Sequence, residues 1–182
     1  MKIFPQLVND RQSTRRYTSQ PIEKEKLNRC LEMARLAPSA SNSQPWTFIA
    51  VTDADLVEKV AQQTFDTIFR FNKFVTQATA LVVIVMEKPK LITQIGGIIK
   101  KKEYPLIDIG IASEHFCLQA TEEELGTCML GWFNEKPIKK LLKIPAGKTI
   151  GLIISVGYPP EDYKIRKKIR KPFDEVVRYN QY

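Results

Sequence analysis

One continuous apolar run, Leu81-Val82-Val83-Ile84-Val85-Met86, limits the folds open to this chain more than any other feature. Six apolar residues in a row, several of them β-branched, are typical of a strand that is covered on both faces. Shorter runs of β-favouring residues occur at 46–51, 128–133 and 150–156. The sequence therefore predicts three or four strands, with the strand at 81–86 fully buried.

Segments with helical spacing of apolar residues lie between these strands. Asp53 is in position to cap the helix that follows it, and Pro38 ends an earlier helix that begins near Pro21. We expect helices over 2–10, between the two prolines, after Asp53, over 64–76, over 108–125 and after Asn134. Strands interleaved with six helices indicate an α+β fold, and we expect one domain over 1–182, a mixed sheet flanked by helices.

The segment 108–125 is the most helix-like part of the chain. Its stripe of Ile107, Ile111, His115 and Leu118 is widened by further apolar residues. So broad an apolar surface favours a helix buried on several sides, such as the core helix of a dimer. The tail at about 160–182 has no room to pack on its own, and we expect it to extend over a partner subunit.

The segment 88–104 gives the weakest signal. The pair Gly96-Gly97 and the run Lys100-Lys101-Lys102 favour a mobile connection or a lid.

Several protein classes are disfavoured by composition. There is no stretch of about 18 apolar residues, so we expect no membrane span, and the first five residues show no signal-peptide pattern. Three widely spaced cysteines, Cys30, Cys117 and Cys128, predict a reducing, cytoplasmic environment rather than a disulfide framework. A single histidine and no Cys-x-x-Cys argue against a zinc site, so we expect no metal.

The formal net charge is +8, concentrated at 100–102 and 164–171. Such a surface can simply be solvated, or it can attract anionic ligands or nucleic acid. Nucleic-acid binding would require stacking aromatics or a reading helix, and the run 164–171 contains no aromatic residue. We therefore expect no nucleic-acid partner.

Two prolines bracket a block of small polar residues in the segment Ala37-Pro38-Ser39-Ala40-Ser41-Asn42-Ser43-Gln44-Pro45-Trp46. This composition indicates a loop against which a flat polar ligand can lie close to the backbone. The pattern Ala-Pro-Ser-x-x-Asn-x-Gln-Pro-Trp resembles the signature loop of the nitroreductase family of flavoproteins. Other segments resemble that family in the same order: Arg11–Tyr17, Leu125–Asn134, Gly157-Tyr158-Pro159 and the basic stretch 168–172.

The resemblance covers nearly the whole chain and implies a function. It implies a nitroreductase-like fold with a mainly antiparallel sheet, an intertwined homodimer, and FMN at the subunit interface. It further implies that NAD(P)H passes a hydride to flavin N5, and that a nitroaromatic, a quinone or a related small acceptor then occupies the same pocket in ping-pong order. No protein side chain is expected to act as a catalytic group, because the cofactor carries the chemistry.

The resemblance also implies which residues contact the phosphate of FMN. Arg11 and Ser13 can supply a guanidinium fork and a hydroxyl, and Lys168 and Arg170 can supply further positive charge. Gln12 stands where relatives often carry Arg or His, and its amide can still donate a hydrogen bond.

Further residues are assigned to the flavin ring and the acceptor. Arg15 is expected beside the pyrimidine edge, where a cation stabilises reduced flavin. The remaining cofactor contacts implied by the resemblance are Pro38, Ser39, Ala40, Ser41 and Gln44 of the second subunit, with Asn72, Leu130 and Gly131. Phe71, Trp132 and Phe133 are candidates to line the substrate face, although each could equally be a packing residue.

Other redox reactions on the same fold stay open as alternatives. Reductive dehalogenation, enone reduction and oxygen-dependent flavin cleavage occur among relatives of this family, and the sequence does not choose among them.

Overall fold

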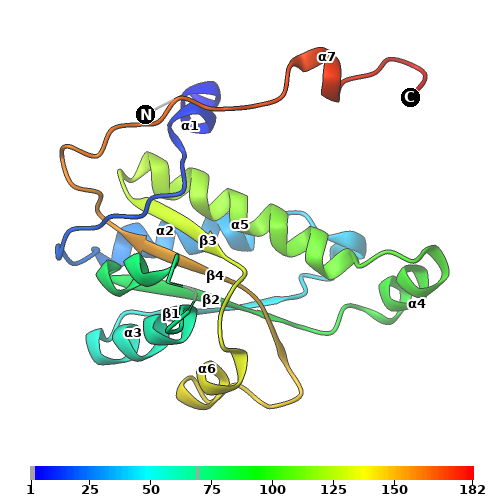
Figure 1. The fold of residues 1–182 in the computed structure, drawn as a ribbon. Coiled ribbons are helices and arrows are strands. Elements are labelled where there is room, and N and C mark those ends of the chain that lie inside the picture. The colour runs from blue at the N-terminus through cyan, green and yellow to red at the C-terminus, as the bar shows by residue number, and fades with distance from the viewer. Residues whose placement is uncertain (1–2, 69) are drawn as a thin grey trace.

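The computed structural model describes residues 3–68 and 70–182, and it contains a four-stranded antiparallel sheet between two layers of helices (Figure 1). The strands are β1 (Trp46–Val51), β2 (Ala80–Met86), β3 (Gly126–Leu130) and β4 (Thr149–Gly157), in the spatial order β1-β2-β4-β3. A parallel bridge between Ser13 and Thr127 adds one short pairing to β3. The expected α+β fold with a mainly antiparallel sheet is confirmed.

The α-helices are α1 (Phe4–Asp10), α2 (Lys24–Arg35), α3 (Ala54–Ala61), α4 (Leu91–Lys100), α5 (Tyr104–Glu122), α6 (Glu135–Leu141) and α7 (Phe173–Val176). Three short 3-10 turns, η1 (Ala40–Asn42), η2 (Gln62–Thr64) and η3 (Lys73–Gln77), complete the elements. Asp53 caps α3 as predicted, since its carboxylate accepts a hydrogen bond of 2.9 Å from the backbone N–H of Leu56.

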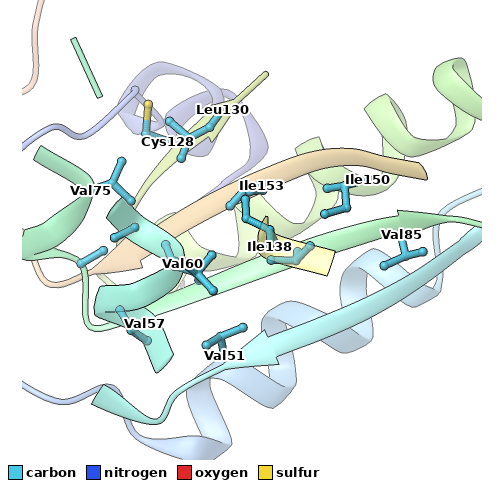
Figure 2. Packing of buried hydrophobic residues seen from close by; sticks show 14 of the residues in the cluster. Val51, Val57, Val60, Val75, Val85, Cys128, Leu130, Ile138, Ile150 and Ile153 are labelled. Atoms are coloured by element: carbon cyan, nitrogen blue, oxygen red, sulfur yellow. The ribbon is translucent and has the colours of Figure 1, made fainter. Parts of the chain in front are cut away.

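Strand β2 explains why the sequence shows an unbroken apolar run. Leu81, Val83 and Val85 point into a core beneath α3 and α6, part of which Figure 2 shows. Alternate residues, including Val82 and Ile84, pack on the other face against α2 and α5. Helices thus cover both faces of an antiparallel sheet, and every side chain of β2 before Met86 is buried.

The segment 88–104 contains helix α4, which passes through Gly96 and Gly97 and ends at Lys100, followed by Lys101 with a φ of 52°. The expectation that this segment is a mobile connection or a lid stays a prediction. One expectation about a helix was wrong. Residues 64–76 do not form one helix. Thr64 and Asn72 each donate a side-chain hydrogen bond to a nearby carbonyl group, including Thr64 Oγ1 to Ala61 O at 2.7 Å, and such bonds compete with the backbone pairing of a helix.

Two glycines allow the segment 11–17 to lie directly against the sheet. A Cβ atom on Gly126 would stand 2.6 Å from the Thr14 side chain, and one on Gly157 would stand 2.8 Å from the Tyr17 ring. Thr14 N donates to Thr127 O at 2.8 Å, and Tyr17 is buried with its hydroxyl 2.8 Å from Ser155 Oγ. The sheet edge therefore fixes the segment that leads from α1 into the body.

We expect Gly157→Ala to lower the free energy of unfolding by about 1–3 kcal/mol, the usual cost of overpacking a core. The buried Tyr17 ring cannot move away without giving up its hydrogen bonds. Urea denaturation followed by circular dichroism measures the change. Gly147→Ala is the control, because nothing stands within 4 Å of its Cβ position; equal stability of the two variants would contradict the close approach.

Candidate functional site

Two segments from opposite ends of the chain meet around one hollow. Residues 11–15 follow α1, and residues 166–170 run back beside them after β4, as the orange segment in Figure 1 shows. The hollow has a volume of about 330 Å³ and is lined by Arg11, Gln12, Ser13, Arg15, Arg166, Lys167, Lys168, Ile169 and Arg170. All six residues that the sequence assigned to these two segments thus lie together.

The returning segment is held by the side chain and backbone of the first. Gln12 Nε2 donates to Lys164 O at 3.3 Å, and Gln12 Oε1 accepts from both the backbone N and Nε of Arg166, each at 3.1 Å. Arg166 Nη2 donates to Ser13 O at 2.6 Å, and Lys168 Nζ donates to Arg11 O. Gln12, expected as a cofactor contact, therefore uses its amide to fix the tail.

The hollow is strongly cationic. Arg11 Nε makes a salt bridge of 3.1 Å to Glu114 Oε1, but Arg15, Arg166, Lys168 and Arg170 add positive charge around the same space. Partial burial lowers the pKa of Lys168 from its usual value, and the nearby Arg11 and Arg170 lower it further. Cations that repel one another in this way favour an anion between them.

The donor set fits a phosphate monoester. Such a group carries close to two negative charges and three acceptor oxygens. Guanidinium and ammonium groups, with the hydroxyl of Ser13, are the donors that proteins commonly present to it. The chemistry of the lining residues, rather than the size of the hollow alone, supports a phosphate-bearing ligand.

The signature loop occupies a different place, between α4 and α5. Ala40 N donates to both carboxylate oxygens of Asp108 in α5, at 3.1 and 3.2 Å. Ser39 and Ala40 are half-buried, Pro38, Ser41 and Gln44 are exposed, and none of the five lines the cationic hollow of its own chain.

Asn72 is engaged within the fold. Its Nδ2 donates to Thr64 O at 3.1 Å and to Trp132 O at 3.2 Å, and the residue is buried. These contacts tie the turns after α3 to the end of β3. The assignment of Asn72 to the flavin stays a prediction, and the observed bonds give it a structural role as well.

The predicted substrate aromatics divide into two groups. Phe71 and Trp132 are exposed and form an edge-to-face pair with ring centroids 5.9 Å apart. Phe133 is half-buried and packs against the core beneath α3 and α6.

The two predicted cofactor contacts after β3 differ in exposure. Leu130 is buried at the end of β3, and Gly131 next to it is exposed.

Sequence reasoning missed three residues of this region: Arg166, Glu114 and Asp108. A signal for Arg166 was available, because residues 166, 168 and 170 alternate as side chains on one face of an extended segment do. Glu114 and Asp108 lie inside a helix and carry no comparable local signal.

Two further kinds of reactive group are relevant to catalysis, the buried thiols and possible metal ligands. Burial raises the pKa of Cys30 and of Cys117 to about 12, so both thiols stay protonated at neutral pH. Within residues 3–68 and 70–182, no group of three or more His, Cys, Asp or Glu side chains could hold a metal ion. In the same ranges, no helix has the length and apolar character needed to cross a membrane.

Fold and site together define a three-layer α+β protein with a cationic hollow between residues 11–15 and 166–170. A model described as the nitroreductase family matches residues 8–158, and this chain belongs to that family. Family membership supports an oxidoreductase function.

Individual relatives agree with this placement. A protein of Archaeoglobus fulgidus, provisionally named an NADH dehydrogenase/NAD(P)H nitroreductase, is 30% identical over 86% of this chain and 85% of its own length. An iodotyrosine deiodinase of Thermotoga neapolitana is 26% identical over the full length of both chains. The solved structure of an FMN-dependent nitroreductase from Clostridium difficile R20291 is 28% identical, has a TM-score of 0.77, and aligns over 97% of this chain and 98% of its own.

Proposed function

We propose that this protein is an FMN-dependent oxidoreductase that uses NAD(P)H to reduce nitroaromatic, quinone or related small acceptors. The observation that carries the proposal is the cationic hollow, in which Arg11, Ser13, Lys168 and Arg170 meet as the family resemblance implies. The FMN-dependent relative supports the choice of cofactor. Bound FMN would supply the redox chemistry, accepting a hydride from NAD(P)H and passing it to the acceptor.

The residues of this chain then have binding and orienting roles. Lys168 and Arg170 would hold the phosphate, while the bond from Arg11 Nε to Glu114 fixes the direction of that guanidinium. Arg15, whose guanidinium carbon lies 6.0 Å from the centre of the Phe74 ring, would place positive charge toward the ring edge of the cofactor. The exposed pair of Phe71 and Trp132 offers an apolar wall for a flat acceptor.

The proposal includes a homodimer. Residues 38–41 and 44 belong to the assigned cofactor site but lie outside the hollow of their own chain. A partner subunit that presents this loop would complete the site, and the extended tail after residue 160, visible at the top of Figure 1, would reach over that partner.

Reductive dehalogenation is the second candidate. The observation that favours it is the full-length match to an iodotyrosine deiodinase. The two functions share the cofactor and differ in the acceptor, so turnover of iodotyrosine compared with nitroaromatics and quinones separates them.

Nucleic-acid binding is disfavoured, since Arg166 and Lys168 of the basic run turn toward residues 11–13.

An absorption spectrum tests the proposal. We expect purified protein to show a flavin spectrum that NADH or NADPH bleaches, and heat should release one FMN per subunit, identified by chromatography. FAD in the released fraction, or a colourless protein that ignores added FMN, would contradict the assignment.

A further inference from the structure

The loop that contains η1 is strained. Ser41, Asn42 and Gln44 have φ values of 54°, 50° and 47°, so three of four successive non-glycine residues lie in the left-handed region. Each such residue costs of the order of 1 kcal/mol or more and persists only where the surrounding structure imposes it. Contacts from outside the loop must therefore hold this conformation.

Two helices supply those contacts. From α4, Thr93 Oγ1 lies 2.9 Å from Ser43 Oγ and donates to Ala40 O at 3.4 Å; Thr93 is buried. From α5, both oxygens of Asp108 accept from Ala40 N. Within the loop, Ser39 Oγ accepts from Gln44 N at 2.9 Å.

Asp108 is an unusual choice for such a contact. Its residue is only 3% exposed, and burial raises the pKa of its carboxyl group because the charged form is poorly solvated. Of the neighbouring elements, η1 contributes the backbone N–H of Ala40, and α4 contributes the uncharged Thr93 to the same loop. Lys90, the N-cap residue of α4, donates its Nζ to Ser41 O of the loop at 3.3 Å. Within residues 3–68 and 70–182, Asp108 accepts from a backbone donor and forms no salt bridge, and a buried carboxylate in that setting is costly. This cost points to a requirement for an acceptor at this position.

We propose that Asp108 and Thr93 are positioning residues that hold the loop 39–44 in its strained form, ready to contact the cofactor of the partner subunit. The positioning itself is a property of one chain, whereas its consequence for FMN rests on the proposed function. Asp108 acts as an acceptor for Ala40 N, and its charge is not required.

The test compares Asp108→Ala with Asp108→Asn. The alanine removes the acceptor, and the asparagine keeps a carbonyl oxygen at the same place while removing the charge. Amide hydrogen exchange of the peptide covering 39–44, measured on protein without FMN, reports the loop directly. We expect Asp108→Ala to speed that exchange at least tenfold and Asp108→Asn to restrict it to within about threefold of the wild-type rate.

A second readout is FMN affinity, measured by quenching of flavin fluorescence. We expect Asp108→Ala to weaken binding by about tenfold, the scale of one lost hydrogen bond plus loop ordering, with Asp108→Asn close to wild type. Thr93→Val, which keeps the shape of the side chain, should show the same pattern to a smaller extent. Asp55→Ala on α3 is the matched control and should change neither quantity.

The outcomes are distinct. Unchanged exchange at 39–44 in Asp108→Ala overturns the positioning role, as does an Asp108→Asn variant that exchanges as fast as the alanine. If Asp108→Ala does not fold, Thr93→Val decides the same question. A protein that fails to bind FMN refutes the proposed function, while the exchange rates still decide whether the loop is held as proposed.

Discussion

Replacing Lys168 and Arg170 together by methionine should weaken FMN binding by about 100- to 10,000-fold. Each cation would lose a charge-assisted contact with the phosphate, and such contacts contribute about 1.5–3 kcal/mol each. The fold should tolerate the change, because Gln12 and Arg166 still hold the returning segment when the bond from Lys168 Nζ to Arg11 O is lost. Titration of the protein with FMN, followed by quenching of flavin fluorescence, measures the loss.

Riboflavin separates this explanation from a general loss of structure. It has the flavin ring but no phosphate, so its weaker binding should be nearly the same in the double variant and in wild type. Lys171→Met is the matched control, since Lys171 belongs to the same basic run but does not line the hollow. Equal losses for FMN and riboflavin would place these cations away from the phosphate.

The same site predicts how affinity depends on pH. A bound phosphate dianion favours protonated Lys168, so affinity is complete below the pKa of this lysine in the free protein and falls as the pH rises through it. Because that pKa is lowered from 10.5, the fall should begin at a lower pH than an ordinary lysine would give. Lys168→Met should lack this component of the pH profile.

The sequence predicts the main features of the fold because its local signals agree with the tertiary structure. The unbroken run at 81–86 becomes a strand covered on both faces, and Asp53 is a helix cap. Prediction fails where side chains decide the local structure. Asn72 donates hydrogen bonds to the backbone carbonyls of Thr64 and Trp132, which is a tertiary arrangement that no local pattern reports.

The candidate site is predictable only in part for the same reason. Arg11 and Lys168 are found by their chemistry and by the resemblance, but the contact of Lys168 with Arg11 O joins residues 157 positions apart. Asp108 was read as the start of an apolar helix, because a buried carboxylate has no signal of its own in a sequence.

Disrupting the proposed dimer is the second change for which we expect a large effect, here on the dimer dissociation constant and on FMN affinity. The outer face of α5 exposes Ile107, which is 53% exposed, and next to it Gly110, with no atom within 4 Å of a Cβ position. Glycine inside a helix costs about 1 kcal/mol relative to alanine. A small residue beside exposed isoleucine is what a closely approaching partner helix would require, at an axis separation of about 8–10 Å.

We expect wild-type protein to have twice the 20.9 kDa subunit mass by size exclusion with light scattering. Gly110→Leu should be harmless to a lone chain, where the space is open and leucine is the better helix former. In a dimer that packs α5 against its copy, the same leucine should drive the subunits apart and raise the dimer dissociation constant at least 100-fold. Gly147→Leu, in the connection between α6 and β4, also meets no atom within 4 Å and is the matched control.

We expect loss of the dimer to cause loss of tight FMN binding. If the loop at 38–41 reaches the flavin from the partner subunit, FMN affinity in Gly110→Leu should rise with protein concentration and follow the dimer fraction measured under the same conditions. The cationic hollow itself would stay intact in the monomer, since Gln12, Arg166 and Lys168 are joined within one chain. The monomer should therefore keep a weak affinity for inorganic phosphate while losing tight binding of FMN. A monomer with undiminished FMN affinity would show that each chain forms the cofactor site alone, and the loop would then need another role.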